Sequence, residues 1–377
     1  MTRQPGTGAP DGRRETGELA ALRGRAVADL GEHRFAAFLD GARVLVTGAG
    51  GSLGRELCRR LAALGAGTLA LVDQAEAALV DVHSELRYEH GFARATPVLA
   101  DLRSPARVER VLAEHRPDVI FHTAAYKLVP VVEAHPVEAA ANNVLATHVL
   151  VEAAARTGVE RLVLYSTDKA IRPANVLGRT KALAECILGT AARRGAATRF
   201  ACIRLGNVLE SSGSMLPLFR RQLAASRPIT VTDARMTRYV MTIGETAGLA
   251  VVAAALADRG DVFRLDMGRP VRVVDAARIV LRAVDDGVGP GIEIVGSRPG
   301  EKLHETLEAP GEPVWATAHE QVLRCGPRYA DDERLEACLG RLRTLVADAD
   351  GDGVGAELAR IVPRIRVDAG AAATVTA

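Results

Sequence analysis

Residues 43–54 read RVLVTGAGGSLG: a short apolar run leads directly into a turn with glycines at positions 48, 51 and 54. The run predicts a buried strand, and the RELCRRLAAL that follows predicts a helix. Gly48, Gly51 and Gly54 then allow a tight turn, a close approach of the backbone to a pyrophosphate, and close packing of helix on strand. A glycine trio alone is weak evidence, but this one lies between a strand and a helix, as a dinucleotide-binding turn requires.

The next apolar run, residues 69–73, ends in Asp73, 19 residues after Gly54. A carboxylate there accepts both ribose hydroxyls of adenosine and repels a 2′-phosphate, so NAD is the expected cofactor rather than NADP. The alternative for Asp73 is a helix N-cap. Asp101, after the third strand, is expected to contact the adenine, again with capping as the alternative. The other residues expected at the cofactor are Ser52, Leu53, Leu102, Ala124 and Ala125.

Strand-like runs alternate with helix-length segments between residues 41 and 206. This alternation predicts an α/β fold with a doubly wound parallel sheet, the Rossmann arrangement, which binds ligands at the carboxyl ends of its strands. The alternation weakens beyond Gly206, so residues 207–345 are expected to form mainly a smaller C-terminal substrate lobe, with some elements returning to the sheet. The runs are Arg43–Val46, Leu69–Asp73, Thr96–Leu99, Val119–His122, Leu162–Ser166 and Phe200–Leu205.

The two ends of the chain lie outside this pattern. Residues 1–17 are rich in glycine, proline and charge without periodicity, and are expected to be a disordered tail. Apolar residues recur every three to four positions within residues 18–40, which predicts one or two amphipathic helices. Residues 346–377 are expected to be a C-terminal extension, mobile from about residue 366. Its DADGDG run imitates the start of a calcium-binding loop, but the twelfth position is Ala359, so a flexible acidic turn is favoured.

The composition excludes several classes of function. A formal net charge of +2 and an aromatic content of 3% argue against a nucleic-acid partner, which requires a basic stripe or stacking rings. No apolar run approaches the ~20 residues that cross a bilayer, so no membrane contact and a cytoplasmic location are expected. Five cysteines without a CxxC pair indicate neither a disulfide framework nor a thiolate zinc site. The histidines show no metal-ligand spacing, so no metal is expected.

Lysine is rare in this chain. Only 4 of the 48 basic residues are lysines, and the other 44 are arginines. Arginine keeps its proton in proteins, whereas burial or a neighbouring charge can shift a lysine toward neutrality. The lysines are therefore candidates for proton transfer. The alternative is that they remained by chance while the composition of the chain drifted from lysine to arginine. They are Lys127, Lys169, Lys181 and Lys302.

The fifth strand ends in Ser166-Thr167-Asp168-Lys169, at the edge of the sheet where cofactor and substrate are expected to meet. Lys181 follows within a helix-like stretch. In short-chain dehydrogenases a tyrosine four residues before such a lysine lies on the same helix face and deprotonates a substrate hydroxyl. Here that position is Leu177, which cannot act as acid or base, so a proton relay must use other groups.

Between about residues 41 and 307, seven blocks of sequence resemble the UDP-N-acetylglucosamine 4,6-dehydratase group of extended short-chain dehydrogenases/reductases. Some relatives carry methionine at the position of Leu177, and many carry a transmembrane N-terminal part, so this chain resembles their soluble catalytic part. It departs from the group at residues 210–214 (ESSGS), where relatives usually show GSRGS, which implies a change in the sugar nucleotide that fits. The blocks are VLVTGAGGSLGREL (44–57), FHTAAYKLVPVVEAHPVEAAANNVLAT (121–147), STDKAIRPANVLGRTKALAE (166–185), RLGNVLESSGS (204–214), MTRYVMT (236–242), LDMGRPVRVVDAARI (265–279) and GSRPGEKLHE (296–305).

The resemblance implies a reaction on a nucleotide-activated hexose, with UDP-N-acetylglucosamine as the expected substrate. NAD takes hydride from C4, water is eliminated across C5 and C6, and the hydride returns to C6, giving a 4-keto-6-deoxy sugar. Asp168 is then the acid at C6 and Lys169 the base at C5. Thr167 holds the C4 oxygen, and Lys181 binds the nicotinamide ribose.

For the substrate, the resemblance points to Lys127 and Asn207 near the sugar and α-phosphate. It places Arg238 and Arg298 at the diphosphate, where planar guanidinium groups suit phosphate oxygens. Surface salt bridges are the alternative for both arginines. The resemblance also implies a homo-oligomer.

Two other functions remain open. An epimerase or a 5,6-dehydratase uses the same C4 oxidation. A protein that binds NAD and a nucleotide sugar without turnover is suggested by Leu177 and by the ESSGS segment. Lys302 also has a simple structural alternative, which is pairing with the adjacent Glu301.

Overall fold

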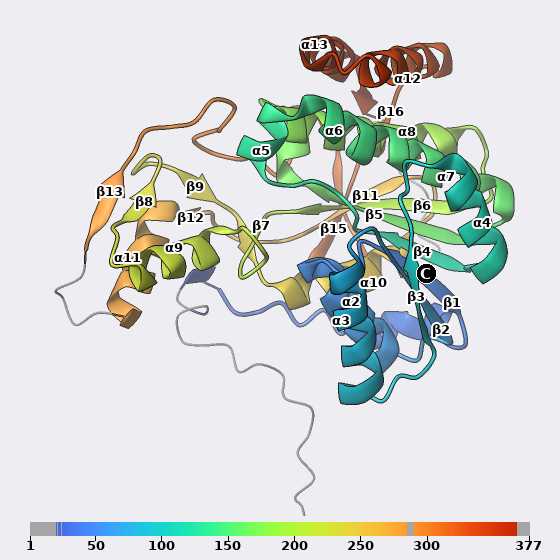
Figure 1. Ribbon diagram of the computed structural model, residues 1–377, viewed down its shortest axis with the longest axis horizontal. Helices are drawn as coiled ribbons and strands as arrows, with labels where there is room; N and C mark the ends of the chain where they lie inside the picture. Colours follow the sequence, from blue (N-terminus) through green and yellow to red (C-terminus); the bar gives the residue numbers. More distant parts are fainter. Residues whose placement is uncertain (1–19, 21, 24, 285–289, 368–377) are drawn as a thin grey trace, which may run out of the picture.

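A nine-stranded sheet forms the centre of the computed structural model, which describes residues 20, 22–23, 25–284 and 290–367 (Figure 1). Neighbouring strands from β3 to β11 pair in parallel, and the β11–β15 and β15–β14 pairs at one edge are antiparallel. In sheet order the strands are β14 (Val314–Ala316), β15 (Val322–Cys325), β11 (Asp261–Leu265), β6 (Arg199–Leu205), β5 (Arg161–Thr167), β4 (Val119–His122), β1 (Arg43–Thr47), β2 (Thr68–Asp73) and β3 (Ala95–Leu99).

The order β3-β2-β1-β4-β5-β6 is that of a doubly wound dinucleotide-binding sheet, which confirms the predicted fold class. All of β4 and the last four residues of β1 are buried, as expected for parallel strands that are covered on both faces. The strand order reverses between β1 and β4, where Thr47 pairs with His122. The carboxyl ends of these two strands therefore open the crevice in which ligands of such sheets bind.

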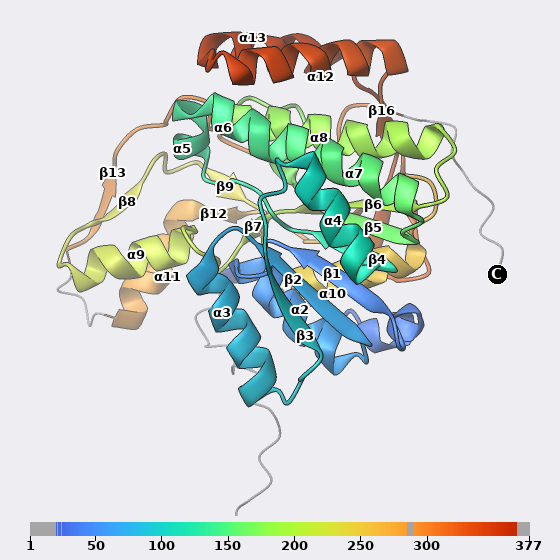
Figure 2. The same ribbon diagram turned by 45° about the vertical axis from the view of Figure 1, so that its right-hand side comes forward.

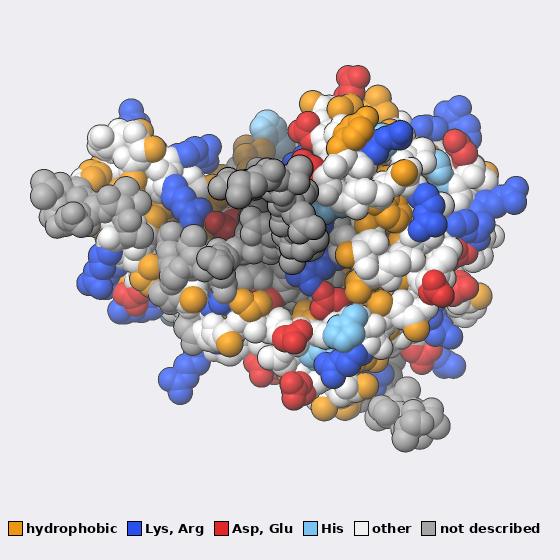
Figure 3. Space-filling view, turned by 90° about the horizontal axis from the view of Figure 1, so that it is seen from below, with side chains coloured by type: hydrophobic (Ala, Val, Ile, Leu, Met, Phe, Trp, Pro, Cys, Tyr) orange, Lys and Arg blue, Asp and Glu red, His pale blue; other side chains and the backbone are white. Residues whose placement is uncertain are grey.

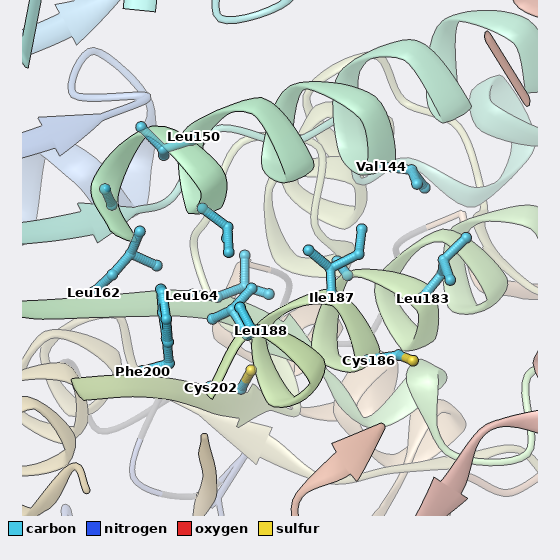
Figure 4. Packing of buried hydrophobic residues seen from close by; sticks show 14 of the residues in the cluster. Val144, Leu150, Leu162, Leu164, Leu183, Cys186, Ile187, Leu188, Phe200 and Cys202 are labelled. Carbon is cyan, nitrogen blue, oxygen red and sulfur yellow. The ribbon is translucent and has the colours of Figure 1, made fainter. Parts of the chain in front are cut away.

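Helices cover both faces of the sheet and bury two separate apolar cores (Figure 2). Figure 4 shows part of the first core, in which Leu162 and Leu164 of β5 pack with Leu188 of α8. On that face the helices are α4 (Pro105–His115), α7 (Ala146–Thr157) and α8 (Val176–Arg193). On the other face they are α2 (Ser52–Ala63), α3 (Glu76–Ser84) and α10 (Ile243–Leu256).

A smaller lobe with its own apolar core lies beside the sheet, at the left in Figure 1. It contains α9 (Met215–Ala224), α11 (Val273–Val284), and the strand pairs β8 (Ile229–Val231) with β13 (Ile292–Ile294) and β9 (Thr237–Arg238) with β12 (Val271–Arg272). The pair β7 (Asn207–Val208) with β10 (Val240–Met241) lies between lobe and sheet. Helix α10 and strands β11, β15 and β14 return to the main sheet.

The C-terminal region contains a helical pair, α12 (Asp332–Ala347) and α13 (Gly351–Ile361), which packs on α6 (Pro136–Ala140) outside the first helical layer (Figure 2). The Asp350 carboxylate caps α13 by accepting the N–H of Gly353 at 2.8 Å, which gives the acidic run a structural role. Arg366 and Val367 form β17 and pair with β16 (Arg328–Tyr329), so the tail that was expected to be mobile begins with an ordered strand. Residues 368–377 lie outside the described residues.

The N-terminal segment, residues 18–40, is helical only in part, and residues 20, 22 and 23 are helical. A 3₁₀-helix, η1 (Glu32–Leu39), is present, but residues 25–31 form no helix. The Glu245 carboxylate, at the start of α10, accepts bonds from the Arg25 side chain (2.5 Å) and the Ala28 N–H (2.8 Å). These tertiary bonds favour an extended path over the local helical preference. The expected tail, residues 1–17, lies outside the described residues.

The surface and the cysteines agree with the composition. On the face shown in Figure 3, Lys and Arg side chains are interspersed with Asp, Glu and apolar groups. All five cysteines are buried and free, and they pack as small apolar residues. Among the described helices, none combines the length and apolar character that spanning a membrane requires.

Candidate active site

Glycines shape the turn that follows β1. Gly48 has a φ of 67°, and a Cβ there would lie 2.7 Å from the Ala124 nitrogen. A Cβ on Gly54 would lie 2.1 Å from the Gly48 carbonyl oxygen, so α2 packs directly against the turn, as the spacing predicts. Gly51 precedes α2, and no side chain caps the helix. The first-turn N–H groups of α2 therefore suit an anion.

A cleft of about 240 Å³ opens beside this turn, at the carboxyl ends of β1, β2 and β4. It brings together nearly all the residues expected at the cofactor: Gly48, Gly51, Ser52, Leu53, Gly54, Asp73, Leu102, Ala124 and Ala125. The lining also includes residues that the sequence reasoning missed: Gln74, Thr123, Tyr126, Asn142 and Ser212. For Gln74 and Thr123, the position just after a strand was the available signal.

The two carboxylates expected at the cofactor lie differently. Asp73 lines the cleft and accepts the N–H groups of Gly50 and Ala75, each at 3.0 Å, so it also holds the turn. Asp101 is not among the described residues that line the cleft. Its carboxylate accepts a bond from the Arg103 side chain at 2.8 Å, which lowers the pKa of Asp101. Its contact with the adenine therefore stays a prediction.

A second cavity of about 220 Å³ adjoins the first and shares Leu53, Thr123, Ala125, Lys127 and Ser212 with it, so the two form one continuous cleft. This second part lies at the end of β5 and contains most of the residues expected to carry the chemistry. Its lining includes Thr167, Lys169, Leu177, Lys181 and Asn207.

The turn after β5 places an acid and an amine side by side. Asp168–Ala170 form a short 3₁₀ turn, η4, and Lys169 Nζ lies 3.0 Å from Asp168 Oδ1 and 3.1 Å from Asn207 Oδ1. Asp168 is fully buried and is not among the described lining residues. The Thr167 hydroxyl lines the cavity and donates to Asp168 Oδ1 at 3.0 Å. Asp168 Oδ2 is buried with no hydrogen-bond partner within the described chain.

Lys181 approaches this turn from α8. Its Nζ donates to the Tyr165 carbonyl at 2.8 Å, and burial lowers the pKa of Lys181 to about 8. Leu177, one turn earlier on the helix, lines the same cavity. The cavity wall is therefore an apolar leucine side chain at the position where short-chain dehydrogenases have the tyrosine that accepts the substrate proton.

The ESSGS segment crosses the cleft at the point where its two parts join. Lys127 Nζ donates to Ser211 Oγ at 3.0 Å, and burial lowers the pKa of Lys127. The Ser212 N–H donates to Ser52 Oγ at 3.0 Å, which ties the segment to the glycine turn. Glu210, the added carboxylate, instead lies 3.0 Å from Arg220 NH1 on α9.

The two arginines expected at the diphosphate lie on the lobe, outside the described lining of both cavities. Arg238 is buried, and its NH1 donates to the carbonyl oxygens of Thr237 (2.7 Å) and Leu303 (3.3 Å). Arg298 is exposed. Their contact with a diphosphate stays a prediction.

Lys302 does not pair with Glu301, so that alternative is wrong. The Glu301 carboxylate accepts the backbone N–H of Arg298 at 3.3 Å. Lys302 Nζ instead lies 2.9 Å from Glu305 Oε2, and Glu305 was not singled out in the sequence.

The similarity of this chain to known proteins identifies its family. The family model described as "Polysaccharide biosynthesis protein" matches residues 44–327, which include every site residue named above. The chain belongs to this polysaccharide biosynthesis family. This chain has the doubly wound fold of the extended short-chain dehydrogenases/reductases.

Two curated members of the family and one solved structure illustrate the similarity. The chain is 39% identical over 311 residues to "Capsular polysaccharide biosynthesis protein CapD" of Staphylococcus aureus, covering 81% of this chain and 52% of that protein. It is 42% identical over 276 residues to "Probable polysaccharide biosynthesis protein EpsC" of Bacillus subtilis, covering 71% and 45%. The chain thus spans about half the length of these relatives. The structure of Pen from Bacillus thuringiensis aligns with a TM-score of 0.72 at 28% identity, covering 76% of this chain and 88% of Pen.

Proposed function

We propose that this chain is an NAD-dependent nucleotide-sugar 4,6-dehydratase that acts on UDP-N-acetylglucosamine. One observation carries the proposal: a buried acid and an amine adjoin the cleft that opens beside the glycine turn. Lys169 lines the second part of the cleft, at the end of β5, and Asp168 lies beside it with one unpartnered carboxylate oxygen. An elimination across C5 and C6 needs such an acid and base within reach of one sugar ring.

The residues of the first cavity fit NAD. The uncapped start of α2 suits the pyrophosphate, and the glycine turn leaves no room for a side chain beside it. Asp73 faces the cleft with a carboxylate that suits the adenosine ribose. Lys181, which lines the second cavity, binds the nicotinamide ribose in this proposal. When bound, NAD supplies reversible hydride transfer at C4 and C6 of the sugar.

The residues of the second cavity then divide the proton transfers. Lys169 removes the C5 proton, which a ketone at C4 acidifies. Asp168 supplies the proton for the departing C6 hydroxyl, and the Thr167 hydroxyl connects Asp168 to the cavity. Because Leu177 replaces a phenol, Thr167 and Lys181 are the polar groups placed to hold a water that receives the C4 hydroxyl proton. Lys127 and Asn207 contact the sugar and α-phosphate, and Arg238 and Arg298 of the lobe bind the diphosphate.

The direct test is incubation of the purified chain with UDP-N-acetylglucosamine and, in parallel, UDP-glucose. The expected product has lost one water and carries a 4-keto group that borohydride reduces. A C4 stereoisomer of the substrate would instead show an epimerase. Unchanged sugar nucleotide in a protein that binds both NAD and the sugar nucleotide would show a binding protein without turnover.

A further inference from the structure

Lys302, the lysine that the proposed reaction leaves without a task, lies against the catalytic turn. Its Nζ donates to the Ile171 carbonyl at 2.7 Å, directly after the Asp168–Ala170 turn. The same Nζ lies 2.9 Å from Glu305 Oε2. Glu305 is almost completely buried, with 2% of its side chain exposed. Lys302 is therefore bonded both to the residue that follows the catalytic turn and to a buried carboxylate.

Glu305 connects this pair to Lys169. Its Oε1 lies 3.8 Å from Lys169 Nζ, whereas its Oε2 lies 2.9 Å from Lys302 Nζ. Asp168, Lys169, Glu305 and Lys302 thus form a row of four charges of alternating sign. In this row Glu305 is hydrogen-bonded to Lys302 but only ion-paired with Lys169.

The segment that carries Lys302 and Glu305 is fixed on both sides. The Asn175 side chain, which caps α8, donates to the Gly300 carbonyl at 2.9 Å. On the lobe, the His304 ring lies within hydrogen-bonding distance of the Thr237 hydroxyl, at 2.9 Å. Glu305 is therefore held in its place beside Lys169 by contacts to both the catalytic turn and the lobe.

We propose that Lys302 and Glu305 are positioning residues that hold the Lys169 amine in place and keep it able to give up its proton. This role rests on the proposed function, in which Lys169 is the base at C5. Glu305 attracts the Lys169 amine through their ion pair and so helps to hold it in place. Lys302 offsets the negative charge of Glu305, so that the Lys169 ammonium can still lose its proton.

The sign of each effect follows from the charges that face Lys169. These are Asp168 on its own turn and Glu305 on the opposite segment, together with the neutral Asn207 of β7. Lys127 and Lys181 line the same cavity. Removing the Lys302 charge leaves both carboxylates uncompensated and favours the Lys169 ammonium. Removing the Glu305 charge leaves Lys302 unpaired nearby and disfavours that ammonium. Burial strengthens both effects.

The number of lysines makes a direct measurement feasible. Growth on [ε-¹³C]lysine gives four labelled side chains in the full-length protein, and the Lys169 signal is the one that Lys169→Arg removes. In Lys302→Met the pH midpoint of the Lys169 signal moves upward by about one unit, and in Glu305→Gln it moves downward by a similar amount. Lys302→Arg keeps the charge and the original midpoint. Lys181, with a pKa lowered to about 8 by burial, provides an internal reference for a folded site.

Glu308→Gln is the matched control, since Glu308 lies three residues beyond Glu305 and pairs with Arg264 instead. It leaves the Lys169 midpoint unchanged. Shifts of the same sign in Lys302→Met and Glu305→Gln, or no shift in either, would overturn the inference. If Lys302→Met does not fold, the inference is tested by two other variants. The nearly isosteric Glu305→Gln must lower the Lys169 midpoint, and the charge-conserving Lys302→Arg must leave it unchanged.

A kinetic measurement separates the inference from the proposed function. The acidic limb of the pH profile of kcat/KM moves in the same directions as the Lys169 midpoint, because the base must be deprotonated to act. The two variants could shift the Lys169 midpoint in opposite directions while the unaltered protein dehydrates no sugar nucleotide. That result would support the roles of Lys302 and Glu305 and overturn only the proposed dehydratase function.

Discussion

The two halves of the cleft are built from different parts of the chain. The cofactor half is built around the backbone of one stretch, the glycine turn and the start of α2, and residues at the ends of β2, β3 and β4, Asp73 among them, line the rest of it. The chemical half is made of side chains that different regions of the sequence contribute. Lys127 meets Ser211, and Lys169 meets both Asn207 and Glu305.

This difference predicts two kinds of sensitivity. Added volume is damaging in the cofactor half, because the backbone of the turn and the helix are already in contact there. Lost or altered charge is damaging in the chemical half, because the proton transfers depend on individual amines and carboxylates.

The largest effect is expected for Lys169→Met. Loss of the base lowers kcat for dehydration by about 10²- to 10⁴-fold, the usual contribution of a general base. Binding of NAD, measured by calorimetry, stays close to that of the unaltered protein, because Lys169 lies outside the cofactor half. Equal loss of NAD affinity and of turnover would show that the two halves are not separable in this way.

In the cofactor half, Gly54→Ala is expected to be the most damaging single methyl group. Its Cβ would lie 2.1 Å from the Gly48 carbonyl oxygen, so helix and turn must separate. The free energy of unfolding falls by about 1–3 kcal/mol, as for other overpacked sites, and urea titration measures it. Gly340→Ala on α12 is the control, since nothing lies within 4 Å of its added Cβ. Equal stability of the two variants would contradict close packing at the turn.

Asp73→Asn tests the carboxylate that is expected to select NAD over NADP. Loss of the carboxylate weakens NAD binding by about tenfold, or about 1.4 kcal/mol. It also reduces the ratio of the affinity for NAD to the affinity for NADP. Asp101→Asn has a smaller effect, because Asp101 pairs with Arg103 and is not part of the described lining. Fluorescence titration with both dinucleotides compares the variants, and a larger effect at Asp101 would place the adenine ribose elsewhere.

Ser211→Ala is expected to have the smallest effect. It removes the hydrogen bond to Lys127 Nζ, which is worth about 0.5–1.5 kcal/mol. The KM for the sugar nucleotide rises by about two- to tenfold, while kcat changes little. A change in kcat alone would assign Lys127 to the chemistry rather than to substrate binding.

The cofactor half follows closely from the sequence, and the chemical half only in part. Glycine spacing and strand-end position are local signals, so Gly48, Gly54 and Asp73 were found where the structure has them. Local sequence gives no signal for contacts between distant segments. Glu305 was therefore missed, although it lies within a recognised block and beside Lys169.

The differences from expectation have the same origin. Residues 25–31 have helical periodicity but instead bond to Glu245 of α10, a tertiary contact that the local pattern does not encode. Asp168, the acid expected at C6, is fully buried and accepts a hydrogen bond from Thr167, and its role stays a prediction. Whether a strand-end carboxylate faces the cleft depends on the turn that follows, and that turn is set by packing.

The most direct test of the central claim is dehydration in D₂O with analysis of the product by NMR. If Lys169 exchanges the C5 proton, the 4-keto-6-deoxy product carries solvent deuterium at C5 and hydrogen transferred from C4 at C6. Lys169→Met then loses both product and label. Recovery of unlabelled sugar nucleotide, or of a C4 stereoisomer without deuterium at C5, would contradict the account.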